Sequence, residues 1–129
     1  MKTALLDTSF LIDLADESAA NVEGPAHRAL ARLKGCRVYV SAITVAELLE
    51  GAEDQHDAAV ALSVYHFQPL GWGAARRCAL VQSRAGRRMG ENDAWQAALA
   101  SAAGHCLVAH DHAFGGRAWL DYLDYRGLC

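Results

Sequence analysis

The chain has 129 residues, of which 53% are hydrophobic and 21% are charged, and its formal net charge is −3 at pH 7. This size and composition are typical of one packed globular domain and exclude a disordered or low-complexity chain. The slightly acidic balance argues against a general nucleic-acid coat protein. We therefore expect a single domain over residues 1–129.

The cysteines and the N-terminal segment indicate the compartment. The apolar run at the N-terminus is interrupted by Asp7 and Asp13 and lacks a small-residue cleavage site, so we do not expect a signal peptide. No segment is long and apolar enough to span a bilayer, and we expect a cytoplasmic protein without membrane contact. Scattered cysteines without Cys-x-x-Cys spacing predict buried or incidental thiols rather than a zinc knuckle or disulfides. These cysteines are Cys36, Cys78, Cys106 and Cys129.

Short apolar runs alternate with helical patterns along the chain. Asp7-Thr8-Ser9 follows the first run and can cap a helix, and Pro25 opens the next helix, for which Gly35 is the expected C-cap. In chain order, the expected elements are strand Thr3–Leu6, helix Phe10–Ala15, helix Pro25–Gly35, strand Arg37–Val40, helix Ser41–Glu50, helix Glu53–Tyr65, strand His66–Leu70, helix Trp72–Arg88, helix Asp93–Ala103 and strand His105–Ala109.

This alternation predicts an α/β fold in which helices cover both faces of a mainly parallel central sheet of four or five strands. The tail from Arg117 to Leu128 is expected to form a short helix or an edge element, and Gly104 is expected to end the helix before the last strand. An apolar stripe on that helix is expected to face the core: Trp95, Ala98, Leu99 and Ala102.

Four carboxylates occupy related places in this map. Asp7 ends the first strand, and Asp111 lies two residues after the last one. Glu47 and Asp93 lie in the expected first turns of two helices that follow strands or loops. Ligands of open parallel sheets bind outside the carboxyl ends of the strands. We therefore expect these four acids to converge on one cleft.

Convergence of acids has an electrostatic consequence. Two carboxylates about 5 Å apart repel each other by about 3 kcal/mol at an effective dielectric near 20. A cluster stays ionised only around a cation, and otherwise some of its members take up protons. Hard divalent ions, Mg²⁺ or Mn²⁺, prefer such oxygen ligands. An ion of this kind lowers the pKa of a bound water and stabilises a leaving oxygen, which is the chemistry of phosphodiester hydrolysis.

Each acid taken alone also has a structural interpretation. Thr44 to Glu47 is a formal capping box, in which the glutamate would bond the Thr44 amide. Asp93 is favourable at a helix N-terminus because of the helix dipole. Asp7 alone is an acceptable N-cap, and Asp111 alone is an acceptable turn residue. The joint order, spacing and strand-end placement of the four favour a shared site.

Four segments resemble the motifs of the PIN-domain family, and most closely those of the VapC-type toxins of prokaryotic toxin–antitoxin pairs. These segments are LLDTSFLIDL, VSAITVAELLEG, RRMGENDAWQAALA and CLVAHDHAF. The resemblance covers essentially the whole chain. It implies a small α/β/α fold, Mg²⁺- or Mn²⁺-dependent cleavage of RNA, a homodimer, and an antitoxin protein that binds across the active site.

Carried over residue by residue, the resemblance implies that Asp7, Glu47, Asp93 and Asp111 are the catalytic acids. Within this set, Asp7, Asp93 and Asp111 are the implied metal ligands. Thr8 matches a small polar position that orients water or substrate. The resemblance thus assigns a role to each acid of the predicted cluster.

The sequence also departs from the family pattern. Ala109 stands where Thr is usual, and Ala113 stands before Phe114 where an acid is common. Asp111 is then the only carboxylate of the fourth motif, which favours one metal site over two. Gln96 stands where members of the family usually carry Ile.

Five arginines lie between residues 76 and 88, immediately before the third motif. On a helix over Trp72–Arg88, Arg77, Arg84 and Arg88 would share one face. We predict that Arg84 and Arg88 contact the RNA backbone. The alternative is a solvated helix face or the rim of a dimer.

The sequence offers three alternatives to the nuclease. His110-Asp111-His112 invites a zinc site, but no third His or Cys lies at ligand spacing. Phosphoaspartyl transfer from Asp7 usually requires a second Asp two residues later, where Ser9 stands. The remaining alternative is a catalytically weakened PIN-like module that binds RNA or protein. The fourth motif lacks the usual Thr and a second acid, which favours this module. The presence of all four acids opposes it.

Overall fold

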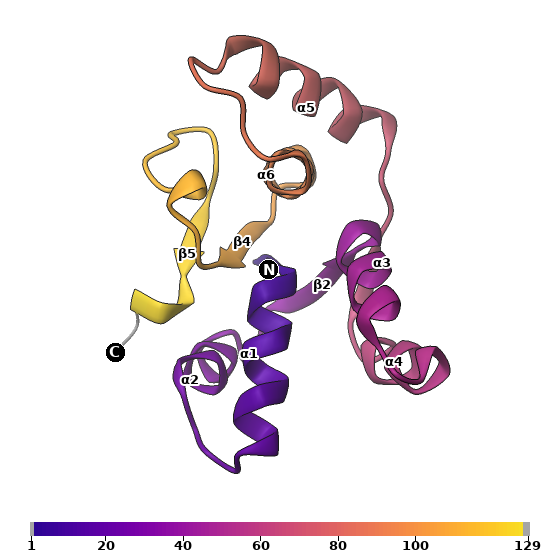
Figure 1. Ribbon diagram of the computed structural model, residues 1–129. Helices are drawn as coiled ribbons and strands as arrows, with labels where there is room; N and C mark the ends of the chain where they lie inside the picture. The colour runs from indigo at the N-terminus through magenta and orange to yellow at the C-terminus, as the bar shows by residue number, and fades with distance from the viewer. Residues whose placement is uncertain (1, 128–129) are drawn as a thin grey trace.

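The computed structural model describes residues 2–127, and its centre is a five-stranded, entirely parallel sheet (Figure 1). The strand order is β3-β2-β1-β4-β5, so the first strand of the chain lies in the middle of the sheet. The predicted α/β fold is confirmed, and the tail supplies the fifth strand at one edge. The strands are β1 (Thr3–Leu6), β2 (Arg37–Ser41), β3 (His66–Gln68), β4 (Cys106–Ala109) and β5 (Tyr122–Asp124).

Helices lie on both sides of this sheet, which gives the predicted three layers. In Figure 1, α5 and α6 lie on one side, and α1 and α2 lie on the other, with α3 and α4 beside them. No helix within residues 2–127 has the length and hydropathy needed to cross a membrane. The helices are α1 (Thr8–Ala19), α2 (Pro25–Arg32), α3 (Ala42–Gly51), α4 (Gln55–Leu62), α5 (Trp72–Arg84) and α6 (Glu91–Ala103), with 3₁₀ turns η1 (His112–Phe114) and η2 (Tyr125–Gly127).

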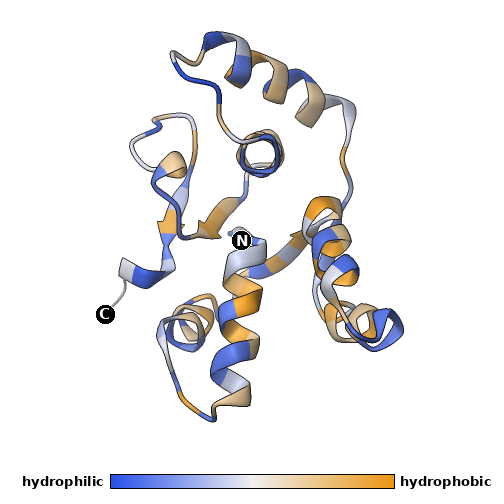
Figure 2. Ribbon diagram, viewed as in Figure 1, coloured by the Kyte–Doolittle hydropathy of each residue, from blue (hydrophilic) through white to orange (hydrophobic). Residues whose placement is uncertain are grey.

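Each face of the sheet has its own apolar core, because successive strand residues point to opposite faces. Leu5 and Leu107 pack with the residues of α5 and α6. Leu6 and Val108, their neighbours in sequence, pack with Phe10 and the residues of α1 and α2. Figure 2 shows the alternating hydrophobic and hydrophilic bands of α1, as expected for a helix with one face on the sheet.

Helix α6 is buried more extensively than the predicted stripe. Ala102 is exposed, so the stripe is wrong at this position, whereas Trp95 is half-buried and packs against the core as predicted. The reason is that α6 packs against both the sheet and α5, which covers more than one side of the helix. Gly104 ends the helix in the left-handed conformation, at φ 75°, as predicted. The buried positions are Ala94, Gln96, Ala97, Ala98, Leu99 and Ala100.

Helix α5 ends at Arg84, four residues earlier than predicted. The next segment is held by Gln82, whose side chain donates to the Met89 carbonyl and accepts from the Met89 amide, each at 2.9 Å. Met89 is buried, which anchors the chain where it leaves the helix. Arg88 therefore lies outside α5, and the predicted common helical face for Arg77, Arg84 and Arg88 is wrong.

Two other helices are shorter than predicted. The C-cap of α2 is Leu33, and Gly35 adopts its positive φ of 90° in the following turn, so the prediction that Gly35 caps the helix is wrong. Helix α4 begins after Asp54, whose carboxylate accepts from the Asp57 amide at 3.1 Å.

Within the described residues, the three cysteines other than Cys129 are free thiols, as predicted, and Cys129 lies outside the described part of the chain.

Candidate active site

The carboxyl ends of β1 and β4 and the first turns of α1 and α6 surround a pocket of about 280 Å³. All four predicted acids and Thr8 line this pocket. The predicted convergence is therefore confirmed at the level of one shared cavity. Arg84 and Arg88 do not line it.

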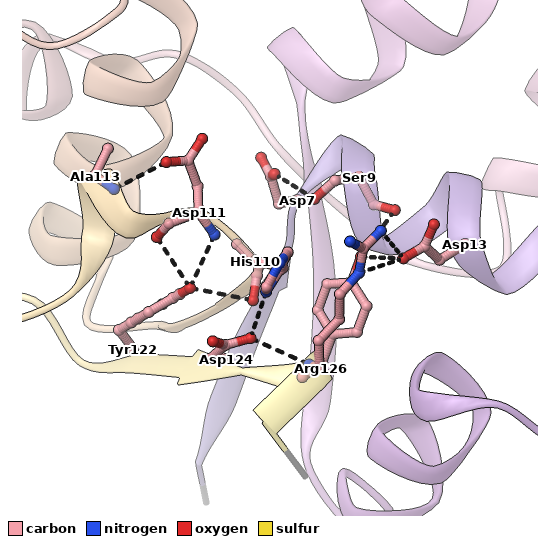
Figure 3. A network of polar contacts seen from close by, with 11 residues as sticks. Asp7, Ser9, Asp13, His110, Asp111, Ala113, Tyr122, Asp124 and Arg126 are labelled. Atoms are coloured by element: carbon pink, nitrogen blue, oxygen red, sulfur yellow. Dashed lines mark hydrogen bonds and ion pairs between the residues drawn. The ribbon is translucent and has the colours of Figure 1, made fainter. Parts of the chain in front are cut away.

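Asp7 connects β1 to α1 and occupies the N-cap position of the helix. Its carboxylate caps no amide of α1, so the capping interpretation does not account for its side chain. One oxygen, Oδ2, accepts from Ser9 Oγ at 2.9 Å (Figure 3). The other, Oδ1, accepts from Gln96 Nε2 at 3.0 Å. The carboxylate is thus held by two uncharged donors within the pocket.

Glu47 lies in the second turn of α3, one turn later than predicted. Ser41 caps this helix and accepts from the Thr44 amide at 3.1 Å, so the capping box with Glu47 is wrong. Instead, Glu47 Oε1 accepts from the Thr8 hydroxyl at 2.7 Å, and Oε2 accepts from Asn92 Nδ2 at 3.2 Å. These two bonds connect α3 to the first turns of α1 and α6.

Asp93 is the third residue of α6, in the first turn as predicted. Burial raises the pKa of its carboxyl, and the negative charges of Asp111, Asp7 and Glu47 raise it further. No donor in the described part of the chain bonds this carboxylate. Burial and the neighbouring charges therefore disfavour the ionised form of Asp93, and no hydrogen bond from a donor in the described residues offsets this effect.

Asp111 follows β4 and caps the turn η1, where its Oδ1 accepts from the Ala113 amide at 2.9 Å. The turn interpretation of this residue is thus correct, although the residue also lines the acid pocket. Tyr122 of β5 holds the backbone: its hydroxyl accepts from the Asp111 amide at 3.2 Å and lies 3.3 Å from the Ala109 carbonyl (Figure 3). The edge strand therefore supports the fourth acid.

The two histidines beside Asp111 do not form a zinc site with it. His110 Nδ1 lies 2.9 Å from Asp124 Oδ1, and this hydrogen bond lowers the pKa of the Asp124 carboxyl (Figure 3). His112 is exposed in η1. Within residues 2–127, no three His, Cys, Asp or Glu side chains are placed to hold a metal ion together.

In the acid pocket too, within residues 2–127, no three acids are placed to hold a metal ion together. The donor set suits a hard cation, because it consists of carboxylates, one of which, Asp93, has a pKa raised by burial and by the charges of the others. In their present rotamers, however, Asp7, Glu47 and Asp111 direct oxygens at donors of the protein. The chemistry of these residues nevertheless fits Mg²⁺ or Mn²⁺, because hard divalent ions prefer carboxylate oxygens.

Gln96, Asn92 and Ser9 each bond one of the acids, and none of the three was predicted to belong to the site. Gln96 offered a signal, since an amide within an alanine-rich buried helix requires polar partners. Asn92 and Ser9 offered none, because their partners are set by how the elements pack. Tyr122 was missed for the same reason.

Three arginines surround a second pocket, of about 330 Å³, on the side of α5 that faces the segment between η1 and β5. Its floor includes Leu80, Val81 and Trp119, and its arginines are Arg77, Arg84 and Arg117. None of these arginines forms an ion pair within the described residues. By contrast, Arg88 pairs with Glu91 at 3.1 Å, in an exposed contact that contributes little to stability.

Several solved structures share the fold of this chain. The chain resembles structures of VapBC2 from Rickettsia felis bound to a promoter DNA fragment (18% identity, TM-score 0.76, 94% of this chain and 97% of that one) and of a toxin–antitoxin complex from Klebsiella pneumoniae (23%, 0.76, 95% and 97%). It also resembles VapBC-1 from nontypeable Haemophilus influenzae (23%, 0.74, 95% and 98%). No curated protein sequence matches it. These likenesses establish a shared fold, and the sequence model of the PIN domain matches residues 4–120. The chain belongs to the PIN-domain family.

Proposed function

We propose that this protein is a metal-dependent ribonuclease of the VapC type, which hydrolyses phosphodiester bonds of RNA. The observation that carries this proposal is the meeting of four remote carboxylates in one pocket, where burial and the charges of the other three acids raise the pKa of Asp93. Membership of the PIN family and the fold shared with chains of toxin–antitoxin complexes support it.

We assign Asp7, Asp93 and Asp111 as the residues that would hold Mg²⁺ or Mn²⁺. Such an ion, when bound, supplies a water of lowered pKa and stabilises charge on the phosphate. Glu47 is held by Thr8 and Asn92 and can accept a proton from the attacking water. Thr8 orients Glu47 through its hydroxyl. The uncompensated Asp93 is the carboxylate with most to gain from a cation.

We propose that the substrate passes from the acid pocket to the arginine pocket. Arg117 Nε donates to the Ala113 carbonyl at 2.6 Å, and the amide of Ala113 donates to Asp111, so one short segment joins the two pockets. Arg84 and Arg117 then bind successive phosphates as cations. Trp119, which is 37% exposed, offers a surface for a base to stack on. To contact the RNA backbone as predicted, Arg88 must release Glu91 and bind a phosphate in its place.

The partner is proposed to be an antitoxin that covers the acid pocket. An apolar groove of about 460 Å³ runs between α1, α3 and α4, and Leu11, Leu48 and Tyr65 line it. Ile12, which is 47% exposed, lines both this groove and the acid pocket. An apolar segment bound in the groove therefore reaches the acids.

Ile12→Asp is expected to abolish co-purification with a short protein encoded next to this one, and unchanged co-purification contradicts this placement. The proposed homodimer is checked by light scattering.

The nuclease proposal is tested by cleavage of structured RNA with Mg²⁺ or Mn²⁺. Asp7→Ala and Asp93→Ala are expected to lower the rate by at least about 100-fold, because each removes a proposed ligand. Asp57→Asn, which neutralises an exposed carboxylate of α4, serves as the matched control and keeps full activity. Cleavage that persists in chelator, or in both alanine variants, contradicts the proposal.

The alternative is a PIN-fold module that binds RNA or protein without cutting. The absence, among the described residues, of three acids already placed around one ion favours it. The two functions separate in one experiment: RNA binding by the wild type without cleavage at saturating Mn²⁺ identifies the binding module.

A further inference from the structure

One buried polar cluster lies directly behind the acid pocket. Gln96 is 1% exposed, and Ser41 and Thr44 are both fully buried, although α6 is otherwise apolar where it enters the core. Burial of an amide or a hydroxyl is unfavourable unless hydrogen bonds replace those to water. The bonds that these residues make therefore determine how they are oriented.

Gln96 uses its whole amide in this cluster. Its Nε2 donates to Asp7 Oδ1 at 3.0 Å and to Thr44 Oγ1 at 2.7 Å, which uses both of its hydrogens. Its Oε1 accepts from Ser41 Oγ at 2.6 Å. The reversed amide would place Oε1 against the Asp7 carboxylate, which repels it. The orientation is thus set by all three partners together.

A second branch leads from Gln96 to Glu47. Thr8 Oγ1 lies 3.0 Å from Thr44 Oγ1 and 2.7 Å from Glu47 Oε1. Each hydroxyl has one hydrogen. Since the carboxylate only accepts, the Thr8 hydrogen points to Glu47, and the Thr44 hydrogen points to Thr8. Gln96 therefore connects two acids that lie 40 residues apart in the chain.

The uncharged nature of Gln96 matters for a cation site. Arginine or lysine at this position would hold Asp7 equally well, but would neutralise the negative charge that attracts a metal ion. An aliphatic side chain, such as the Ile usual in the family that the sequence resembles, would leave Asp7 without this donor. Each carboxylate oxygen has two lone pairs, so one bond from Gln96 leaves Oδ1 able to accept a metal.

We infer that Gln96 is a positioning residue: it orients the Asp7 carboxylate, and through Thr44 and Thr8 also the Glu47 carboxylate, at the pocket in which the divalent ion would bind. This inference rests on the proposed function, because it concerns the affinity of the same pocket for metal. It adds to that function a residue that touches neither the ion nor the RNA.

The test is Mn²⁺ binding, measured by calorimetry without RNA. Gln96→Leu is expected to weaken binding about tenfold or more, since a hydrogen bond to a charged group is lost. Gln96→Met, which keeps the length of the side chain, is expected to behave in the same way and replaces Gln96→Leu if that variant does not fold. Leu99→Ala, a buried change in the same helix without a bond to the acids, destabilises the protein but keeps the wild-type affinity.

A metal-free measurement separates the two proposals. The side-chain amide protons of Gln96 are expected to exchange slowly in NMR spectra of the wild type, and to lose protection in Asp7→Ala. Wild-type protein that binds no Mn²⁺ overturns the proposed metal function, and the amide protons then decide the inference. Wild type and Gln96→Leu that bind Mn²⁺ equally, or Gln96 protons unaffected by Asp7→Ala, overturn the role of Gln96 alone.

Discussion

Asp93 differs from the other acids of the pocket in its hydrogen bonds and in its pKa. Asp7, Glu47 and Asp111 each accept hydrogen bonds from the protein, and Asp93 accepts none within the described residues. Burial and three neighbouring charges raise the pKa of Asp93. A carboxyl whose pKa is raised by folding favours the folded state only in acid, and this contribution is lost as the pH rises through the raised pKa. Above the raised pKa, the charge of Asp93 therefore destabilises the fold.

Asp93→Asn is therefore expected to increase the free energy of unfolding at pH 7, by roughly 0.5–1 kcal/mol, while it abolishes cleavage. Thermal or urea denaturation measures the change, and Asp57→Asn is again the control. Added Mn²⁺ should stabilise the wild type by mass action and leave Asp93→Asn unaffected. Lower stability of Asp93→Asn than of the wild type at pH 7 would contradict this account.

At the scale of elements, one carboxylate joins two helices. Glu17 of α1 accepts from the backbone amides of Gly24, Ala26 and His27, at 2.9–3.0 Å, and so caps α2, whose own N-cap is a glycine. Burial alone would raise the pKa of Glu17, but the bonds from the amide and ring of His27, and from the other two amides, lower it to about 2. Its stabilising contribution is complete above the unfolded value of about 4.5 and is lost as the pH falls towards 2.

Glu17→Gln is expected to lower the free energy of unfolding by about 1–2 kcal/mol at pH 7, as loss of a helix cap does. The difference from the wild type should shrink as the pH falls below about 4.5, because the wild-type carboxyl then takes up its proton. Denaturation curves at several pH values measure both effects. Glu23→Gln, an exposed neighbour, is the matched control, and equal pH dependence of the two variants would refute the assignment.

At the scale of the whole molecule, His105 connects distant parts of the sheet at the end opposite the acid pocket. This residue is 5% exposed, and its ring lies 4.4 Å from the ring of Tyr39. Its Nε2 donates to Gln68 Oε1 at 2.8 Å, so the neutral ring accepts from the Thr3 hydroxyl at Nδ1, at 2.6 Å. Burial lowers the pKa of His105. The protonated ring would lose the bond from Thr3.

We expect the free energy of unfolding to fall as the pH drops below about 6.5, the unfolded pKa of histidine, because the unfolded state then binds a proton that the buried ring does not. His105→Gln should flatten this dependence at the cost of some stability at pH 7. Denaturation between pH 5 and 8 measures it, with His56→Gln, an exposed histidine of α4, as the control. An unchanged slope in His105→Gln would exclude this residue as the source.

Local sequence pattern determined the element types, the parallel α/β fold and the strand-end placement of the four acids, because hydrophobic period and capping residues act over a few neighbouring residues. Tertiary structure decided what these acids contact. Gln96, Asn92 and Tyr122 reach them from segments far away in sequence, and no local pattern encodes such pairs. The end of α5 was set in the same way, by Gln82 binding a backbone segment that only packing brings near.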